Sequence, residues 1–329
     1  METADLTLVD VARSGFEGPF ADWTADARYF EYTKAANPIG AGLTPHIPMQ
    51  RFPAALHAGG PTRVVPLDLS EALGVTGGAA TSPGLLASFV RIVGGDEVST
   101  APNATSELYY VLSGAGFSSV NGELVSWGAG DVLTLPAGSR SVHHADADAV
   151  LYWVHDEPLL RYLGVEARVA RFRPTRYPAE RSLAELDRIA SAPHATDRNR
   201  LSVLLANAEN PQTLTVTHVL WAMVGVLPAG QVQPPHRHQS VALDLIIDCR
   251  PGCYTLVGDG IDDEGRIVGA TRVDWEAGGA FVTPPGRWHA HHNESGSDAH
   301  LMPVQDAGLQ TYLRSLDIRF ATTRTTARQ

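Results

Sequence analysis

Six of the 13 histidines in this chain fall between residues 236 and 300, at His236, His238, His289, His291, His292 and His300. Neutral imidazole is the commonest side-chain metal ligand, so the cluster indicates a metal site. Side chains alternate across a strand, so His236 and His238 share one face, as do His289 and His291 on another strand. We predict that His236, His238 and His289 hold one metal ion. His291 then lies beside it, and His292 and His300 lie outside the site.

The predicted ligand set contains no carboxylate. Ala242 and Leu243 follow the second ligand, and we expect Asp244 to point away from the site. Three neutral histidines leave the full 2+ charge on the metal, which favours an anionic chelating ligand and leaves positions open for O2. Imidazole suits Fe, Cu, Ni and Zn alike, so the ligands alone do not select the ion.

Short strands must position these residues. Gly (31) and Pro (22) are plentiful among the 329 residues, which favours many turns and short strands over long helices. The pattern predicts an all-β protein: an extension over residues 1–80, a barrel over 81–170, a linker over 171–212, and a metal-binding barrel over 213–329. Helices are expected at 20–35, 182–192 and 307–316, followed by a frayed tail at 322–329.

An internal repeat supports two barrels. The spacing G-x5-P-x-G of residues 278–286 recurs at residues 130–138, and the G-x5-H-x-H spacing of residues 230–238 has its counterpart at 95–103. Both spacings resemble the two motifs of the cupin superfamily. The resemblance implies tandem jelly-roll barrels, a bicupin with a few peripheral helices.

The repeat also distinguishes the two copies. The first has Ala101, Asn103 and Ser141 where the second has its three predicted ligands. We therefore predict that the first barrel is structural and lacks metal ligands. His143 and His144 are the histidines that could restore a site there.

Two segments carry a narrower resemblance. Residues 236–243, HRHQSVAL, resemble the HRHxxxAL segment of gentisate 1,2-dioxygenases and their salicylate-cleaving relatives, and residues 281–291, FVTPPGRWHAH, resemble their FVLTPPxxWHxH segment. In that family the metal site lies in the N-terminal cupin, and an arginine stands where this chain has Asp244. The resemblance implies Fe(II) on the three histidines and O2-dependent cleavage of an aromatic ring beside a carboxylate and an ortho hydroxyl.

The same resemblance suggests roles for the neighbouring residues. His291 is expected to be catalytic, as the acceptor of the substrate hydroxyl proton. The predicted substrate-binding residues are Gln239, Arg287, Trp288, Asn293 and Gln305. Arg237 and Arg287 are the two arginines that could clamp a substrate carboxylate. Arg237 lies between two inward histidines and should point outward, whereas Arg287 lies on a loop and could turn either way.

The leading hypothesis is an Fe(II) ring-cleaving dioxygenase acting on a small hydroxylated aromatic acid and O2. The alternatives are another metal-dependent cupin enzyme (an isomerase, lyase or non-aromatic oxygenase with Mn, Ni or Zn) and a non-catalytic binding bicupin. For the metal itself, Mn, Ni, Cu and Zn are the alternatives to iron. Metal analysis together with oxygen uptake would separate these hypotheses.

Charge and composition limit the partners. Lys plus Arg number 25 and Asp plus Glu 36, for a net charge of −11, which argues against nucleic acid and anionic membranes. Attraction for an anionic substrate must then come from the metal and a nearby arginine. The N-terminus lacks a signal-peptide core, the longest apolar stretch is too short for a bilayer, and the two cysteines are expected to be reduced. We expect a cytoplasmic homodimer or homotetramer.

Overall fold

The computed structural model describes residues 23–195 and 198–321, and the chain divides into two units, residues 1–44 and 45–329. In the first unit, the described part contains one helical turn, α2 (Tyr32–Ala35). The helix predicted over residues 20–35 is therefore wrong from residue 23 to 31, and residues 20–22 lie outside the described part. Trp23 and Phe30 are 90% and 79% exposed. A short helix needs a packed apolar face to be stable, and none covers these side chains within their unit.

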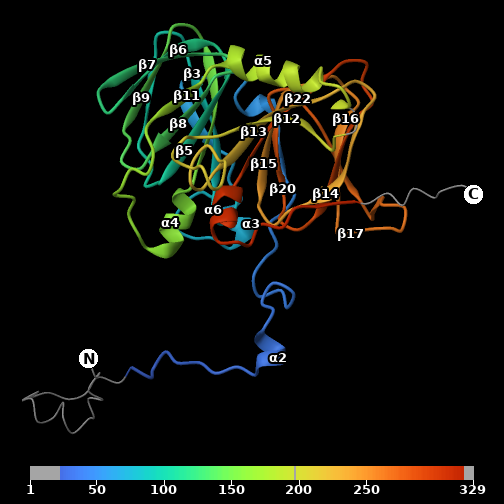
Figure 1. Cartoon of the computed structure of the whole chain (residues 1–329). Helices are drawn as coiled ribbons and strands as arrows, with labels where there is room; N and C mark the ends of the chain where they lie inside the picture. The colour runs from blue at the N-terminus through green and yellow to red at the C-terminus, as the bar shows by residue number, and fades with distance from the viewer. Residues whose placement is uncertain (1–22, 196–197, 322–329) are drawn as a thin grey trace, which may run out of the picture. The chain divides into compact units, whose positions relative to one another are not determined.

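The first barrel of the second unit consists of two sheets (Figure 1). The six-stranded sheet has the order β11 (Thr175–Tyr177), β8 (Val132–Pro136), β5 (Ser106–Ser113), β10 (Ala149–His155), β3 (Leu86–Ile92), β2 (Arg63–Pro66). The four-stranded sheet has the order β4 (Glu97–Thr100), β9 (Ser141–Ala145), β6 (Ala115–Val120), β7 (Glu123–Gly128). Every pairing in these sheets is antiparallel, as in a jelly roll.

The second barrel repeats this plan. Its six-stranded sheet has the order β1 (Arg51–Phe52), β20 (Ala280–Thr283), β15 (Ala242–Asp248), β22 (Ala299–Gln305), β13 (Trp221–Leu227), β12 (Leu201–Leu205). Its five-stranded sheet has the order β19 (Thr271–Asp274), β16 (Cys253–Gly258), β21 (Trp288–Asn293), β14 (Val232–Arg237), β23 (Arg319–Phe320). A small hairpin joins β17 (Gly260–Ile261) to β18 (Ile267–Val268).

Helices are few and peripheral. They are η1 (Ala54–Leu56, a 3-10 turn), α3 (Ser70–Leu73), α4 (Glu157–Leu163), α5 (Ala179–Ala190) and α6 (Ala307–Tyr312). Figure 1 shows α5 at one end of the barrels and α3, α4 and α6 at the other. The helices predicted at 182–192 and 307–316 are thus present with shifted or shorter bounds, and the predicted tail, 322–329, lies outside the described residues.

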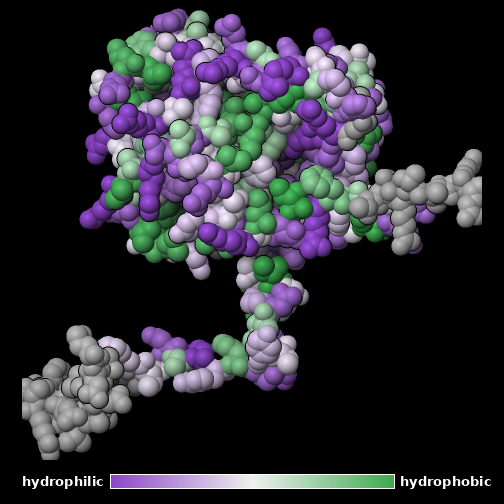
Figure 2. Space-filling model, viewed as in Figure 1, coloured by the Kyte–Doolittle hydropathy of each residue, from purple (hydrophilic) through white to green (hydrophobic). Residues whose placement is uncertain are grey.

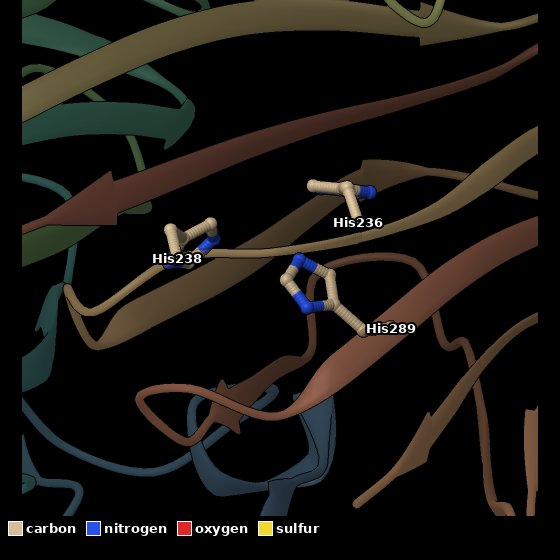
Figure 3. Close-up of side chains that lie close together, drawn as sticks. All are labelled: His236, His238 and His289. Atoms are coloured by element: carbon tan, nitrogen blue, oxygen red, sulfur yellow. The ribbon is translucent and has the colours of Figure 1, made fainter. Parts of the chain in front are cut away.

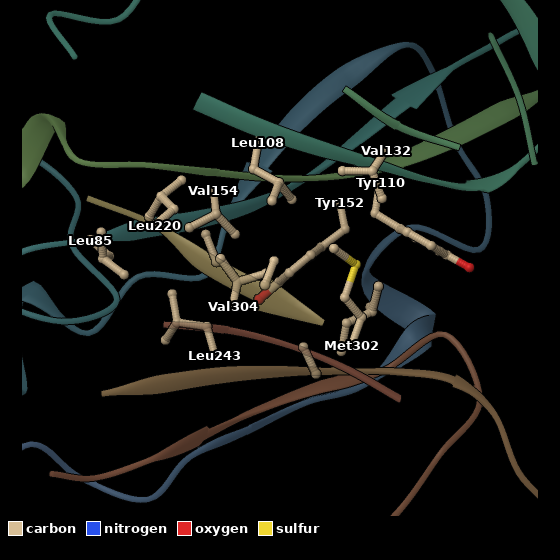
Figure 4. Packing of buried hydrophobic residues seen from close by; sticks show 14 of the residues in the cluster. Leu85, Leu108, Tyr110, Val132, Tyr152, Val154, Leu220, Leu243, Met302 and Val304 are labelled. Carbon is tan, nitrogen blue, oxygen red and sulfur yellow. The ribbon is translucent and has the colours of Figure 1, made fainter. Parts of the chain in front are cut away.

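The two barrels pack against each other through their six-stranded sheets (Figure 4). Alternation along each strand makes this possible. On β5, Leu108 and Tyr110 enter the core between the barrels, whereas Tyr109 enters the interior of the first barrel. On β15, Leu243 likewise meets the first barrel, and Ile246 points into the second. Both faces of these sheets are buried, which explains their continuous hydrophobic sequences.

The predicted fold class, tandem all-β cupin barrels, is confirmed. The domain boundaries at residues 80, 170 and 212 stay a prediction. Strand pairing adds that β1 and β2, which precede residue 80, each extend a different barrel. Residues 213–220, at the start of the predicted second barrel, are irregular, and the strand β13 begins at Trp221.

On the face shown in Figure 2, hydrophilic residues cover much of the surface, and hydrophobic residues lie between them. Among the described residues, no helix combines the length and the apolar character needed to cross a membrane.

A chain of buried hydrogen bonds fills the interior of the first barrel. It runs in order through Trp127, Ser118, His143, Thr100, Tyr109 and Glu107, and Trp153 donates to the same Glu107 oxygen. The histidine proposed as a rescue ligand, His143, is therefore engaged at both ring nitrogens. His144 points elsewhere and lies against Phe117, with ring centroids 5.0 Å apart.

We expect Glu107→Gln to flatten the dependence of stability on pH. Burial raises the pKa of the Glu107 carboxyl from 4.5 to about 8, so between these values the folded protein keeps a proton that the unfolded chain releases. The free energy of unfolding of the wild type therefore falls as pH rises through this window, by about 1.4 kcal/mol per unit from this group. Urea unfolding at several pH values in the window measures the difference. Glu123→Gln, at an exposed position of the same barrel, is the control, and an unchanged slope in Glu107→Gln would contradict the expectation.

Candidate metal centre

Two neighbouring strands bring the three predicted ligands together. His236 lies on β14, His238 follows directly after that strand, and His289 lies on the antiparallel neighbour β21. His236 and His289 are register partners. One ring nitrogen from each of the three histidines lies within 4.8 Å of the others, and Figure 3 shows the rings gathered around a common space. This is the arrangement that the sequence predicted.

The outer nitrogen of each ring is held by the backbone. The carbonyl oxygens of Pro234, Ser240 and Arg287 lie 3.2, 2.8 and 3.1 Å from the Nδ1 atoms of His236, His238 and His289, respectively. A carbonyl oxygen only accepts, so Nδ1 carries the proton of each neutral ring and Nε2 keeps its lone pair. Metal-binding histidines are commonly oriented in this way.

The interior also favours neutral rings. Burial lowers the pKa of His238 to about 4 and those of His236 and His289 well below their ordinary value, and the charge of Arg200 lowers all three further. Neutral imidazoles with inward lone pairs fit a divalent transition metal without any change of protonation. Among the described residues, the group spaced to hold a metal contains these three histidines and no carboxylate. A bound metal would keep coordination positions for other ligands.

His291 lies next to this group without belonging to it. Its side chain is buried, and its ring centroid is 5.7 Å from that of His289. Its Nδ1 atom lies 2.8 Å from the hydroxyl oxygen of Thr255, and burial holds its pKa well below the ordinary value. The structure therefore places the predicted catalytic histidine beside the site, in contact with a hydroxyl group and not with a carbonyl.

Three predicted substrate-binding residues point to other partners. The Trp288 ring lies under the Arg237 guanidinium, 5.4 Å from ring centroid to carbon, on the side of β21 opposite to His289. Arg287 is 37% exposed and pairs with Asp259 at 2.8 Å. Both amide ends of Asn293 are occupied. Nδ2 donates to the carbonyls of Leu227 on β13 and of Ser297, and Oδ1 accepts from the Ser295 backbone and hydroxyl.

The two predicted glutamines support the site from outside. The side-chain oxygen of Gln239 accepts from the backbone of Asp317 and so fastens the segment after His238 to the C-terminal part of the chain. The Ser240 hydroxyl donates to Gln305 at 2.8 Å and lies 3.0 Å from Nδ1 of His238. Gln305 therefore reaches the metal centre through Ser240.

The two remaining histidines of the cluster lie outside the site, as predicted. His292 is half-buried and stacks on Tyr254, with ring centroids 4.7 Å apart. His300 pairs with Asp248 at 2.9 Å.

Asp244 is a correction. The sequence interpretation turned it away from the site, but Leu243 and Leu245 on either side of it face the first barrel. Alternation therefore directs Asp244 into the second barrel. There it is 3% exposed and accepts a hydrogen bond of 2.6 Å from Thr283. Burial raises its pKa to about 6.

Arg200 is the functional candidate that sequence reasoning missed. Its Nε atom donates to Ser202 at 3.0 Å, and its Nη2 atom is buried with no hydrogen-bond partner among the described residues. Its charge lowers the pKa of the predicted ligands and of His291, and it interacts with the carboxylate of Asp244. Arg200 lies far upstream of both motifs, and the search for a cation was confined to arginines inside them.

A small hollow of about 60 Å³ lies beside Arg200. Arg200, Asn199 and Gln233 supply polar groups to its lining, and Leu227 and Leu301 supply apolar surface. The Gln233 amide nitrogen lies 3.4 Å from Nε2 of His236. The hollow therefore has the Arg200 side chain and an apolar surface in its lining, and it approaches the predicted ligands through Gln233, which contacts His236.

Together these features define a pair of cupin-type barrels, of which one carries three histidines spaced to hold a metal ion and the other has a closed polar interior. No protein-family model matches the chain. Curated relatives include a 5-aminosalicylate 1,2-dioxygenase from Comamonas sp, 40% identical over 80 residues, which are 24% of this chain and 21% of the relative. A 5-nitrosalicylic acid 1,2-dioxygenase from Bradyrhizobium sp is 36% identical over 93 residues, which are 28% of this chain and 45% of the relative. Each match thus spans less than half of the relative.

Solved structures extend the similarity to the whole fold. Salicylate 1,2-dioxygenase from Pseudoaminobacter salicylatoxidans, with gentisate, matches with a TM-score of 0.66 over 97% of this chain and 96% of that chain, at 15% identity. The resemblance to gentisate and salicylate 1,2-dioxygenases that the two motifs predicted is therefore confirmed in sequence over part of the chain. The fold is shared over nearly all of it.

Proposed function

We propose that the chain is an Fe(II)-dependent ring-cleaving dioxygenase of small hydroxylated aromatic acids. The observation that carries the proposal is the occurrence, in one region of the second barrel, of three inward imidazole lone pairs and of a guanidinium whose Nη2 atom is buried without a hydrogen-bond partner. The first suits a divalent metal, and the second suits the carboxylate of an acid. The names of the curated relatives, 1,2-dioxygenases of salicylate-type acids, support the same chemistry.

The residues divide the work by their chemistry. A bound Fe(II) supplies the Lewis-acid and redox chemistry that insertion of O2 into a ring requires. Arg200 binds the carboxylate and holds it at the edge of the metal centre, and Leu227 and Leu301 contact the ring. Burial excludes water, so the attraction between guanidinium and carboxylate is much stronger than it would be at the surface.

The test is oxygen uptake by protein loaded with Fe(II) under anaerobic conditions. The panel contains gentisate, salicylate, a hydroxynaphthoate and an aminophenol-type compound. We expect at least one acid to consume one O2 per molecule while its aromatic absorbance disappears. Zinc-loaded protein is the matched control, because zinc accepts the same ligands but has no redox chemistry. Absence of O2 uptake with the whole panel would overturn the proposal, and turnover without O2 would favour another metal-dependent cupin reaction.

We also propose that the protein works in the cytoplasm as a homodimer or homotetramer. Cys249 and Cys253 are free thiols, which fits a reducing compartment. Size-exclusion chromatography with light scattering measures the molar mass of the assembly directly. A single-chain mass at micromolar concentration would contradict the oligomer.

A further inference from the structure

A hydrogen-bond chain from Trp275 through Thr255 ends at His291, the buried histidine beside the predicted metal ligands. The Thr255 hydroxyl oxygen lies 2.8 Å from Nδ1 of His291 and also accepts a hydrogen bond of 2.8 Å from the indole nitrogen of Trp275. Thr255 is fully buried, and Trp275 and His291 are 7% and 2% exposed.

The direction of these bonds follows from the groups involved. An indole N–H can only donate, so Trp275 donates to Thr255. Among the described residues, His291 is the one other partner of that hydroxyl, so the hydroxyl proton points at Nδ1 of His291. Nδ1 then accepts, and a neutral ring must carry its proton on Nε2. This is the opposite tautomer to that of the three predicted ligands, whose Nδ1 atoms donate to carbonyls.

We propose that Trp275 and Thr255 are positioning residues that make His291 a hydrogen-bond donor toward the ligand in the metal centre. The inference rests on the proposed function for the identity of that ligand, an aromatic acid bound through oxygen atoms. It revises the role predicted from sequence, because a ring that already carries a proton on its inner nitrogen does not accept one there. It also explains why His291 is no metal ligand: its inner nitrogen presents a proton and not a lone pair.

The first barrel contains the same indole–hydroxyl–histidine arrangement, but there the Nε2 atom of the histidine also has a hydrogen-bond partner. Trp127 donates to Ser118 at 2.9 Å, and the Ser118 hydroxyl lies 2.7 Å from Nδ1 of His143. Trp127 and His143 precede Trp275 and His291 by the 148 residues of the internal repeat. There, Nε2 of His143 lies 2.9 Å from the hydroxyl of Thr100, the next member of the buried chain.

This comparison shows what the second barrel lacks. The repeat aligns Thr100 with Pro235, which has no side-chain acceptor, and Glu107 with Ala242. No hydrogen bond joins Nε2 of His291 to another of the described residues. The N–H group that the first barrel satisfies internally is therefore free, in the second barrel, to donate to a bound oxygen.

Nitrogen-15 NMR of the histidine rings tests the tautomer without any turnover. In metal-free and zinc-loaded wild type, we expect His291 to show a protonated Nε2 and an unprotonated Nδ1, with the opposite assignment for His236, His238 and His289. His291→Gln identifies the signal. A protonated Nδ1 on His291 in the wild type would overturn the inference. If the tautomer is as expected but no acid is turned over, the proposed function fails and the inference about the proton stands.

Substitutions of Thr255 then test whether this residue positions the His291 proton or only stabilises the fold. Thr255→Val is expected to remove the hydrogen-bond signature at Nδ1 of His291 and lower kcat by about tenfold, with little change in KM. Thr255→Ser restores both, because the first barrel already uses serine at this place. Ser118→Ala, the matched change in the first barrel, should alter the His143 signal and leave kcat unchanged. Equal kcat in Thr255→Val and the wild type would overturn the proposed role.

Discussion

His289→Ala is expected to abolish metal binding, and all metal-dependent turnover with it. The two nitrogens that remain, from His236 and His238, come from one strand segment and approach the metal from one side. His289 is the one predicted ligand from the opposing strand. Loss of an outer partner of a ligand already costs roughly 10–100-fold in affinity, and loss of the ligand itself should cost more. Metal content of the purified, dialysed protein and oxygen uptake after Fe(II) loading measure the two effects.

His292→Ala is the matched control for this variant. His292 lies on the same strand but stacks on Tyr254 on the other side of the sheet. Its removal takes one imidazole from the same segment without touching the metal centre, so metal content and turnover should stay close to those of the wild type. Full metal occupancy in His289→Ala, or loss of metal in His292→Ala, would show that the three-histidine assignment is wrong. Circular dichroism of both variants checks that the sheets persist.

The ligands were predictable because their geometry is local. Strand alternation brings His236 and His238 to one side, and the resemblance to the two cupin motifs places His289 on the opposing strand. The fold class followed from the same repeat. Neither prediction depends on how the sheets pack against each other, and neither changes if a strand boundary is wrong by one or two residues.

The environment of the ligands was less predictable, because it depends on contacts between distant segments. Arg200 lies in the segment before β12, Thr255 lies on β16, and Trp275 directly follows β19, all outside both motifs. Trp288 and Asn293 were chosen for their nearness to His289 in sequence. Alternation turns Trp288 outward, and backbone groups of β13 and of the turn after β21 occupy the Asn293 amide.

The helix predicted over residues 20–35 failed for a different reason. Its spacing of apolar residues is compatible with a helix, but amphipathic helices gain most of their stability from packing. Within its unit, nothing covers Trp23 or Phe30. Local pattern therefore overestimates helix where no surface is available to bury the apolar face.

Removal of the buried guanidinium of Arg200 should lower affinity for the acid without affecting the metal. We expect Arg200→Leu to reduce kcat/KM for the preferred aromatic acid by about 10- to 100-fold, the worth of a hydrogen bond to a charged group in a buried site. The loss should appear mainly in KM, while metal content stays at the wild-type level. Arg200→Lys keeps the charge but loses the planar fork, so it should recover only part of the loss.

Stability should move in the opposite direction to activity in this variant. Nη2 of Arg200 is buried without a hydrogen-bond partner. Its desolvation costs free energy that Leu does not incur, and the nearby charge of Asp244 offsets only part of that cost. Arg200→Leu should therefore unfold at the same or higher denaturant concentration than the wild type, although it binds the acid less well. Arg287→Leu, at the partly exposed arginine that pairs with Asp259, is the matched control and should leave KM nearly unchanged. A rise in KM in Arg287→Leu together with an unchanged KM in Arg200→Leu would assign the carboxylate contact to Arg287, the arginine within the motif.

Because the chain as a whole carries a net charge of −11, an anionic substrate gains nothing from long-range attraction. A cation inside the barrel must therefore supply the attraction that the surface does not.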